Sequence, residues 1–471
     1  MRLTVRNIIE CAIFAIILIF SLAMPDTDII YVSLLMVWTG SVFYCLRDIH
    51  KRAMLFAFLI TFFIFLLGRD FVKQFLAYEL ESIERKAEVH VWISFLISLL
   101  SLVFSFNFFT ERVKREDKKP KNLSIKSKIY KQAVRQNSLM FFYISYVFAI
   151  ISKIAVIIYV YNSSFTQYYV GYSDYLKRNT LLYIISKIEI MMPISWAIYL
   201  GTFPKKRDIR LPFALYFIYL LLSLGTGQRS TSMLGLIFLL VYYLFRDRDE
   251  EVWISKKLMI AGLISLPFLA LFISFYEMYR RGANLASANL IDGVLKFLYD
   301  QGVTSTIVKK AYIYKGFIPD QIYSLEFMHS GILARLFNIP VYHGNNVDHA
   351  LYGGSFSHSL SYITMRNSYL AGMGTGSSYI AELYQDFSYP GIVLGNILYA
   401  YIIYKISNLD KNKYISNGYK LFIIPFILWA PRGSLTNFIS QSLTPSTIAV
   451  FLFIFTFSYA MSYRDINPRS R

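Results

Sequence analysis

Twelve long apolar segments recur along the 471 residues and limit the folds open to this chain. Only 16% of the residues are charged, whereas a water-soluble domain of this size carries about 25%. Apolar segments without paired charges are typical of membrane-spanning helices. The predicted spans are 8–24, 28–46, 53–68, 89–109, 139–161, 180–201, 211–224, 230–245, 258–276, 390–407, 419–430 and 446–462. The sequence therefore predicts an all-α polytopic membrane protein with about 12 transmembrane helices.

The distribution of Lys and Arg indicates how these spans are oriented. Residues 111–137 hold ten Lys and Arg, whereas the much longer segment 277–389 holds eight. The positive-inside rule then places residues 111–137 and both chain termini in the cytoplasm. The net charge of +19 reflects this topology, so nucleic acid is not predicted as a partner. Residues 8–24 could be a secretory signal peptide, but the spans that follow favour a signal anchor.

One external segment is far longer than the other connections and divides the chain into three regions. Residues 1–276 contain predicted spans 1–9, residues 277–389 form the large outer loop, and residues 390–471 contain spans 10–12. The loop is rich in Tyr, Phe, Leu and Ile, whereas disordered segments have low hydrophobicity. We therefore predict that it folds into short, partly amphipathic helices on the outer membrane surface.

Several charged residues occupy positions where a membrane makes charge expensive or rare. Arg229, Arg280, Arg281 and Arg432 stand where predicted spans meet the outer face. Each could be an interface anchor, but a guanidinium also binds phosphate oxygens in bidentate fashion. Together they predict a site for a lipid-linked phosphate or pyrophosphate.

Three further charged residues, Lys153, Lys187 and Glu189, lie inside predicted spans. Uncompensated charge within a membrane is costly. These side chains either neutralise one another or line a substrate cavity, and the sequence leaves both readings open.

A glycine-rich stretch, "AGMGTGSSYIAELYQDFSYPG", precedes the predicted span at 390. Its run "GMGTGSS" is similar to phosphate-cradling loops, but no Lys follows the glycines, so a nucleotide P-loop is not predicted. Gly374 and Gly376 provide a flexible turn, and Ser377 or Ser378 is a suitable N-cap for a helix. Pro390 stops this helix or starts the next one.

The predicted helix after this loop has two faces. Apolar side chains share one face by their spacing of three and four, whereas Glu382, Gln385 and Asp386 share the other. Glu382 and Asp386 are therefore expected to project together at the outer mouth of the next span. They form either a solvated helix face or a general base beside a bound headgroup, and the pattern does not decide between the two.

Histidines of the outer loop are the remaining candidates for chemistry. His358 lies in a Gly/Ser/His segment and is either a structural hydrogen-bonding residue or a base. His343, His349 and Asp348 carry the donors that metals use, but their spacing fits no compact metal motif. Neither a metal nor another cofactor is predicted.

Three motifs together resemble a known family. They are "GTGSSYIAELYQDFSYPGIVLGNILY" at 374–399, "GGSFSHSLSY" at 353–362 and "GTGQRSTSMLGLIFLL" at 225–240. In a twelve-span protein with a large late loop, they resemble the Wzy-type O-antigen polysaccharide polymerases of Gram-negative bacteria. Members of that family typically continue Asp-Phe-Gly-Tyr, whereas this chain has Ser388 in place of the glycine and adds Pro390.

The resemblance implies a glycosyltransferase of the inner membrane that joins undecaprenyl-pyrophosphate-linked oligosaccharide units at the periplasmic face. The growing chain would pass to a sugar hydroxyl of the incoming unit, with pyrophosphate leaving. It implies Glu382 as first choice of base, then His358 and then Asp386, with the four arginines binding pyrophosphate. Membrane lipids are expected partners, and a chain-length regulator is a further candidate.

Two other classes share some of these features. A polyprenyl-linked saccharide flippase or other transporter would also have about twelve spans, but shorter outer loops and polar residues at the membrane midplane are typical of transporters. An O-antigen ligase would share the donor and differ in the acceptor. Only the resemblance favours the polymerase over the ligase.

Overall fold

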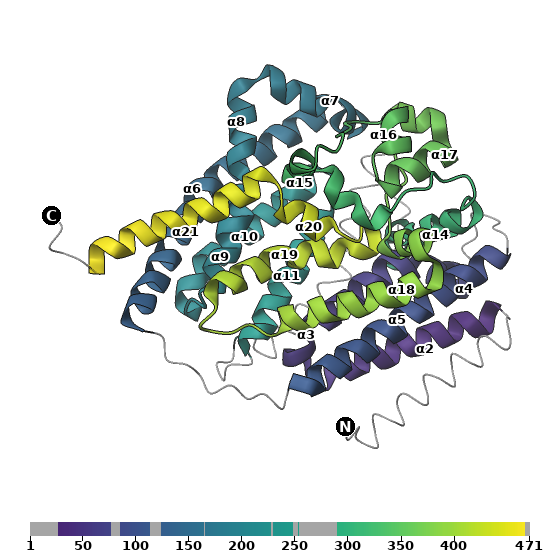
Figure 1. Ribbon diagram of the computed structural model, residues 1–471, viewed down its shortest axis with the longest axis horizontal. Helices are drawn as coiled ribbons and strands as arrows, with labels where there is room; N and C mark the ends of the chain where they lie inside the picture. The colour runs from purple at the N-terminus through teal and green to yellow at the C-terminus, as the bar shows by residue number, and fades with distance from the viewer. Residues whose placement is uncertain are drawn as a thin grey trace.

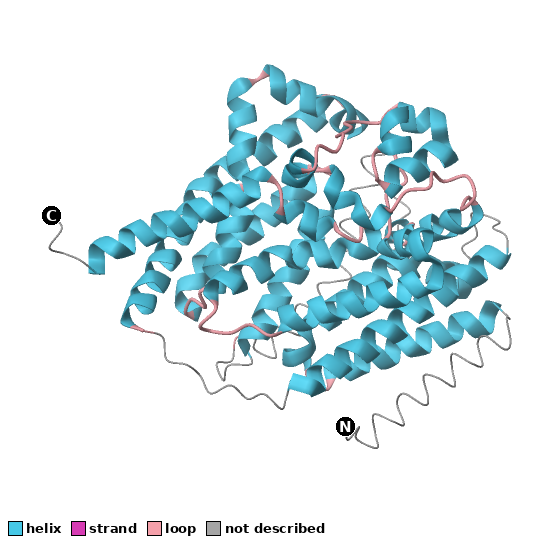
Figure 2. Ribbon diagram, viewed as in Figure 1, coloured by secondary structure: helices cyan, strands magenta, loops and turns pink. Residues whose placement is uncertain are grey.

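A computed structural model of the chain describes residues 27–76, 85–113, 124–163, 165–227, 229–247, 253 and 290–466. Within these ranges the regular elements are all helices (Figure 2), so the all-α prediction is confirmed for this part of the chain. The predicted spans 8–24 and 258–276, together with Arg280 and Arg281, lie outside the described residues.

The helices follow one another with short connections. In chain order they are α2 (Thr27–Leu46), α3 (Ile49–Phe62), the π-helical η1 (Phe63–Leu67), α4 (Gly68–Leu76), α5 (Arg85–Val113), α6 (Ile125–Asn162), α7 (Phe165–Arg178), α8 (Thr180–Glu189), α9 (Met191–Gly201), α10 (Lys206–Gly225), α11 (Arg229–Asp247), α13 (Leu290–Gln301), α14 (Thr304–Ile313), the 3-10 helix η3 (Tyr323–His329), α15 (Gly331–Leu336), α16 (Val347–Tyr352), α17 (Phe356–Leu370), α18 (Tyr379–Ser407), α19 (Tyr414–Trp429), the 3-10 helix η4 (Ala430–Arg432), α20 (Asn437–Ser442) and α21 (Pro445–Ile466).

Nine helical stretches in the described ranges are long and apolar enough to cross a membrane. They are Ile29–Leu46, Ile49–Gln74, Arg85–Glu111, Ile125–Asn162, Thr180–Gly201, Lys206–Gly225, Ser230–Asp247, Tyr379–Ser407 and Pro445–Tyr463. Each overlaps one predicted span. The predicted span 419–430 falls in α19, which has 16 residues and is shorter than these nine.

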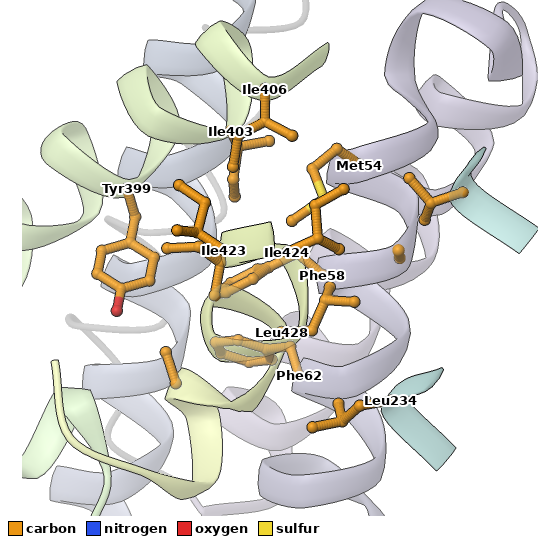
Figure 3. Close-up of a cluster of buried hydrophobic side chains, with 14 of the residues drawn as sticks. Met54, Phe58, Phe62, Leu234, Tyr399, Ile403, Ile406, Ile423, Ile424 and Leu428 are labelled. Carbon is orange, nitrogen blue, oxygen red and sulfur yellow. The ribbon is translucent and has the colours of Figure 1, made fainter. Parts of the chain in front are cut away.

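The long helices pack into one bundle (Figure 1). α18 packs along α5, α9 lies between α6 and α19, and α21 packs on α6. Figure 3 shows one part of the core, where Phe58 of α3, Tyr399 of α18, Ile424 of α19 and Leu234 of α11 meet. These side chains come from four helices distant in sequence, so the core depends on tertiary packing of the spans.

α9 and α19 cross at two glycines. A Cβ atom added to Gly201 would lie 2.5 Å from the backbone nitrogen of Gly418, closer than any side chain can approach. Small residues at a helix crossing allow the two backbones to come into contact within a membrane. Asn417 donates a side-chain hydrogen bond to the carbonyl of Gly201 at the same crossing (3.4 Å).

Two of the three charged residues noted inside the predicted spans form an ion pair. Lys153 Nζ of α6 lies 2.8 Å from Glu189 Oε1 of α8, and Tyr219 of α10 donates its hydroxyl to the same oxygen (3.2 Å). Lys187 is exposed, and its ammonium lies 5.0 Å from the ring of Tyr183. The ion pair therefore joins Lys153 and Glu189 and neutralises charge between three helices.

The helices between residues 290 and 370 gather at one end of the bundle, with α14, α16 and α17 at the upper right of Figure 1. The sequence predicts short helices lying on a surface, but α14 packs against α5, η1 and α18. Its side chains from Thr304 to Ala311 are mostly buried. The expectation of a surface position is wrong for α14, because its apolar side chains are covered by the spans rather than by lipid.

Candidate functional site

The glycine loop turns sharply between α17 and α18. Gly376 has φ 81°, a left-handed conformation that glycine adopts without steric cost. Ser361 of α17 tethers the loop, because its Oγ accepts a hydrogen bond from the backbone N–H of Thr375 (2.8 Å). Ser378 is the N-cap residue of α18, as the sequence predicts, although its hydroxyl makes no capping hydrogen bond. Gly374 lies in the same turn, where an added Cβ would be 3.5 Å from Ser361 Oγ.

Glu382, in the first turn of α18, is only 1% exposed. Ser377 donates its hydroxyl to Glu382 Oε1 (2.6 Å), and the backbone N–H of Leu435 donates to Oε2 (2.8 Å). The reading of a solvated helix face is wrong for Glu382, because residues 379–384 are all buried. The carboxyl group instead joins the glycine loop to the loop that follows Arg432.

Asp386, one helical turn further on, holds a different segment. Its Oδ1 accepts from the backbone N–H of Tyr323 (2.9 Å) and its Oδ2 from that of Ser324 (2.7 Å). These donors belong to the first turn of η3, where free N–H groups favour a carboxylate. Asp386 and Glu382 therefore fasten two separate loops to one helix.

α18 is kinked directly after Asp386. Phe387 and Ser388 leave helical geometry, and Ser388 has φ 55° and ψ −149°, a conformation that glycine strongly favours. Lys315 donates to Ser388 Oγ (2.9 Å) and lies 4.4 Å from the ring of Tyr384. The kink lies at Ser388, and Pro390 follows it at the start of the continuing helix.

Arg432 is the one predicted phosphate-binding arginine whose side chain the structure describes. Its Nη1 donates to the carbonyl oxygen of Gln301 (3.0 Å) and to Gln301 Oε1 (2.8 Å). Its guanidinium carbon lies 5.7 Å from the ring centres of Phe65 and Trp429. The backbone of Arg229 begins α11, and its side chain is outside the described set.

Arg69 is a second arginine that bonds to this part of the fold, and it is not among the residues predicted from the sequence. Its Nη1 donates to Thr306 Oγ1 (3.0 Å) and its Nη2 to the hydroxyl of Tyr299 (2.9 Å). Arg69 directly follows predicted span 53–68, so the criterion that selected the other arginines at span ends would have found it. Because Tyr299 and Gln301 are neighbours on α13, Arg69 and Arg432 both bind the last turn of that helix.

A buried ionic network lies beside Arg69. Lys309 of α14 is 2% exposed, and its Nζ lies 3.3 Å from Glu88 Oε1 and 3.9 Å from Asp70 Oδ1. Asp70 also accepts hydrogen bonds from Ser305 Oγ (3.2 Å) and Trp92 Nε1 (3.1 Å). A buried lysine needs such compensation, and its partners are distant in sequence, so no local pattern predicted this network.

Two histidines stack in the segment that holds α16 and α17. The rings of His349 and His358 are 3.6 Å apart between centroids and nearly parallel. Tyr369 donates its hydroxyl to the carbonyl of Asn346 (3.0 Å), so its oxygen accepts from His358 Nδ1 at 2.9 Å. A neutral His358 protonated at Nδ1 leaves Nε2 as a proton acceptor.

The surroundings of His358 keep it neutral. Burial, and secondarily the adjacent His349, lower the pKa of His358 to about 4. Burial also lowers the pKa of nearby His329. Among the described side chains, including His343 and Asp348, no group of three or more His, Cys, Asp or Glu residues is arranged to hold a metal ion.

The described helices and their buried charges define a class: a polytopic integral membrane protein whose cationic and carboxylate groups meet where α13, α14 and α18 join the bundle. A family model described as O-antigen polysaccharide polymerase Wzy matches residues 6–464, nearly the whole chain. The chain belongs to this family, and the resemblance based on its motifs is confirmed. The search of curated proteins found no match, and neither did the search of solved structures.

Proposed function

We propose that this protein polymerises undecaprenyl-pyrophosphate-linked oligosaccharide repeat units into O-antigen polysaccharide at the periplasmic face of the inner membrane, with both termini in the cytoplasm. The acceptor sugar hydroxyl attacks the anomeric carbon of the growing chain. A new C–O bond forms, the C–O bond to the lipid pyrophosphate breaks, and the hydroxyl proton passes to a base. Family membership supports this reaction.

The hydrogen bond from Leu435 to Glu382 is the observation in the site that carries this proposal. It fixes the loop that starts three residues earlier at Arg432, and Ser377 fixes the glycine loop to the same carboxyl group. Around these two contacts, the buried hydroxyls of Ser378, Ser434 and Thr436 have no hydrogen-bond partner among the described residues.

Buried polar atoms without partners are rare, so each calls for an explanation. A ligand rich in oxygen atoms, such as a pyrophosphate or a sugar, would satisfy these hydroxyls on entering between the two loops. Arg432 is adjacent and would bind the departing pyrophosphate. Further candidates for this role are Arg69, Arg229, Arg280 and Arg281. Glu382 then acts as a positioning residue for the Arg432 loop.

His358 is the stronger candidate for the base. Its hydrogen bond to Tyr369 leaves Nε2 free to accept a proton, whereas both oxygens of Glu382 already accept hydrogen bonds. Its lowered pKa keeps the ring neutral near pH 7, so Nε2 is unprotonated, although a group with a pKa of about 4 is a weaker base than an ordinary histidine. Both carboxyl oxygens of Asp386 accept hydrogen bonds from the backbone of η3, so its role is to hold that segment in position.

Deleting the gene in a strain that makes long-chain O-antigen tests the reaction class. We expect lipid A core capped by a single repeat unit. Uncapped core with lipid-linked polymer accumulating would indicate a ligase, and uncapped core with unpolymerised lipid-linked units held in the cytoplasmic leaflet would indicate a flippase. Unchanged polymer length would contradict the proposal.

A further inference from the structure

A cavity of about 300 Å³ lies between α9, α10, α11 and α19, which are neighbours in the centre of Figure 1. Its lining is apolar and rich in aromatic side chains, including Trp196, Tyr216, Phe238 and Phe426. The histidines and carboxylates described above do not contribute to it. It therefore differs in chemistry from the Glu382 and His358 sites.

One end of the cavity is polar. Ser230 and Thr231 line it at the beginning of α11, and Asn437 lines it at the beginning of α20. Trp429 lines the same end, and its ring centre is 5.7 Å from the guanidinium of Arg432. This polar end of the cavity is thus next to the arginine that the proposed function assigns to pyrophosphate.

The other end lies deep among the spans. Along α11 the lining runs from Ser230 to Phe238, which is about 12 Å at the helical rise of 1.5 Å per residue. α11 begins at this polar end, and the positive end of a helix dipole favours an anion nearby. The apolar lining and the neighbouring Arg432 fit an apolar chain that ends in a phosphate group.

We propose that this cavity binds the polyprenyl chain of the lipid-linked substrate, at the units nearest the pyrophosphate. This inference rests on the proposed function and adds the place where the lipid is held. A polyprenyl pyrophosphate combines an apolar chain with more negative charge than the single phosphate of a phospholipid. It therefore matches an apolar cavity that lies beside Arg432.

Binding of sugar-free undecaprenyl pyrophosphate to the purified full-length protein in detergent tests the inference. Ala197 and Thr231 line the cavity at its deep and polar ends. Ala197→Phe or Thr231→Phe should weaken binding about tenfold, the effect of losing contact with roughly two methylene-sized groups. Ala460→Phe, at an exposed position of α21, is the matched control and should leave binding unchanged.

Folding of each variant is checked by size-exclusion chromatography. If one of the two cavity variants does not fold, the other still tests the inference. Equal affinity of Ala197→Phe, Thr231→Phe and the wild-type chain would overturn the inference. Competition by phosphatidylglycerol as strong as by undecaprenyl pyrophosphate would also overturn it, because the cavity would then bind any membrane lipid.

The probe carries no sugar, so its binding is independent of polymerisation. If deletion of the gene leaves polymer length unchanged while the cavity variants lose undecaprenyl pyrophosphate, the polymerase proposal fails and the lipid site stands. If deletion abolishes polymer while the cavity variants bind normally, the lipid site fails and the polymerase proposal stands.

Discussion

Glu382 accepts a hydrogen bond from the backbone N–H of Leu435 at 2.8 Å, and this contact joins the first turn of α18 to the loop behind Arg432. The two residues are 53 positions apart in sequence. Ser377 completes the arrangement by donating to the second carboxyl oxygen. A carboxyl group with both oxygens engaged and 1% exposure acts through the loops that it holds.

Replacing Glu382 tests this positioning role. Glu382→Gln presents an amide NH2 to one of two donors, so one hydrogen bond is lost at a cost of about 1–3 kcal/mol. We expect O-antigen chain formation to fall severely, with a lower thermal unfolding temperature and normal membrane insertion. Ser377→Ala should shift both measurements in the same direction, because it removes the other half of the contact. If Ser377→Ala leaves both unchanged while Glu382→Gln abolishes polymer without destabilisation, Glu382 is the base.

The two arginines on the last turn of α13 predict a second result. Arg432→Ala and Arg69→Ala should each reduce polymer formation severely, because they remove positive charge and hydrogen bonds to Gln301 and Tyr299. Arg432→Lys should restore little polymer formation, since an ammonium cannot bind a phosphate group in bidentate fashion. Glycan ladders from a complemented deletion strain measure this. The exposed Arg366→Ala is the matched control, and a similar loss there would argue against a specific site.

The histidine stack predicts a dependence of stability on pH. His358 has a pKa of about 4 in the folded chain, whereas an unfolded histidine titrates near 6.5. Between these values the unfolded chain binds a proton that the folded chain does not, so stability falls as the pH drops from 6.5 towards 4. The loss from this group is at most about 3 kcal/mol and is reduced by partial exposure.

Thermal unfolding at pH 7.5 and pH 5 measures this effect. His358→Gln should flatten the dependence on pH and should also reduce polymer formation if His358 is the base. If the stability of His358→Gln depends on pH in the same way as that of the wild-type chain, the lowered pKa of His358 is contradicted.

The kink of α18 predicts a difference between two variants at one position. Ser388→Gly and Ser388→Ala both lose the hydrogen bond from Lys315, so that loss cancels in the comparison. Only glycine relieves the backbone strain at φ 55° and ψ −149°. We expect Ser388→Gly to be more stable than Ser388→Ala by about 1–2 kcal/mol, after the entropy of the unfolded glycine is taken into account. Equal unfolding temperatures would show that the kink carries no strain.

Much of the fold follows from the sequence because a membrane-spanning helix can be recognised from the apolar composition of its own residues. Apolar length alone located the nine long helices, and the glycines and serines before Tyr379 indicated the turn and the N-cap of α18. The break near Pro390 was also readable, although the strained residue proved to be Ser388. Motif similarity was enough to indicate the family.

The sequence by itself determined the helical membrane architecture, the glycine turn and the family, because each depends on local composition, backbone preference or short motifs. Only the tertiary structure decided that Glu382 is buried, that Arg69 joins Arg432 on α13, and that Lys309 is compensated by Asp70 and Glu88. A helical pattern shows which side chains share a face, but not what covers that face. Burial and pairing depend on which distant segments meet: Glu382 bonds to a residue 53 positions away, and Arg69 and Lys309 bond to residues more than 200 positions away.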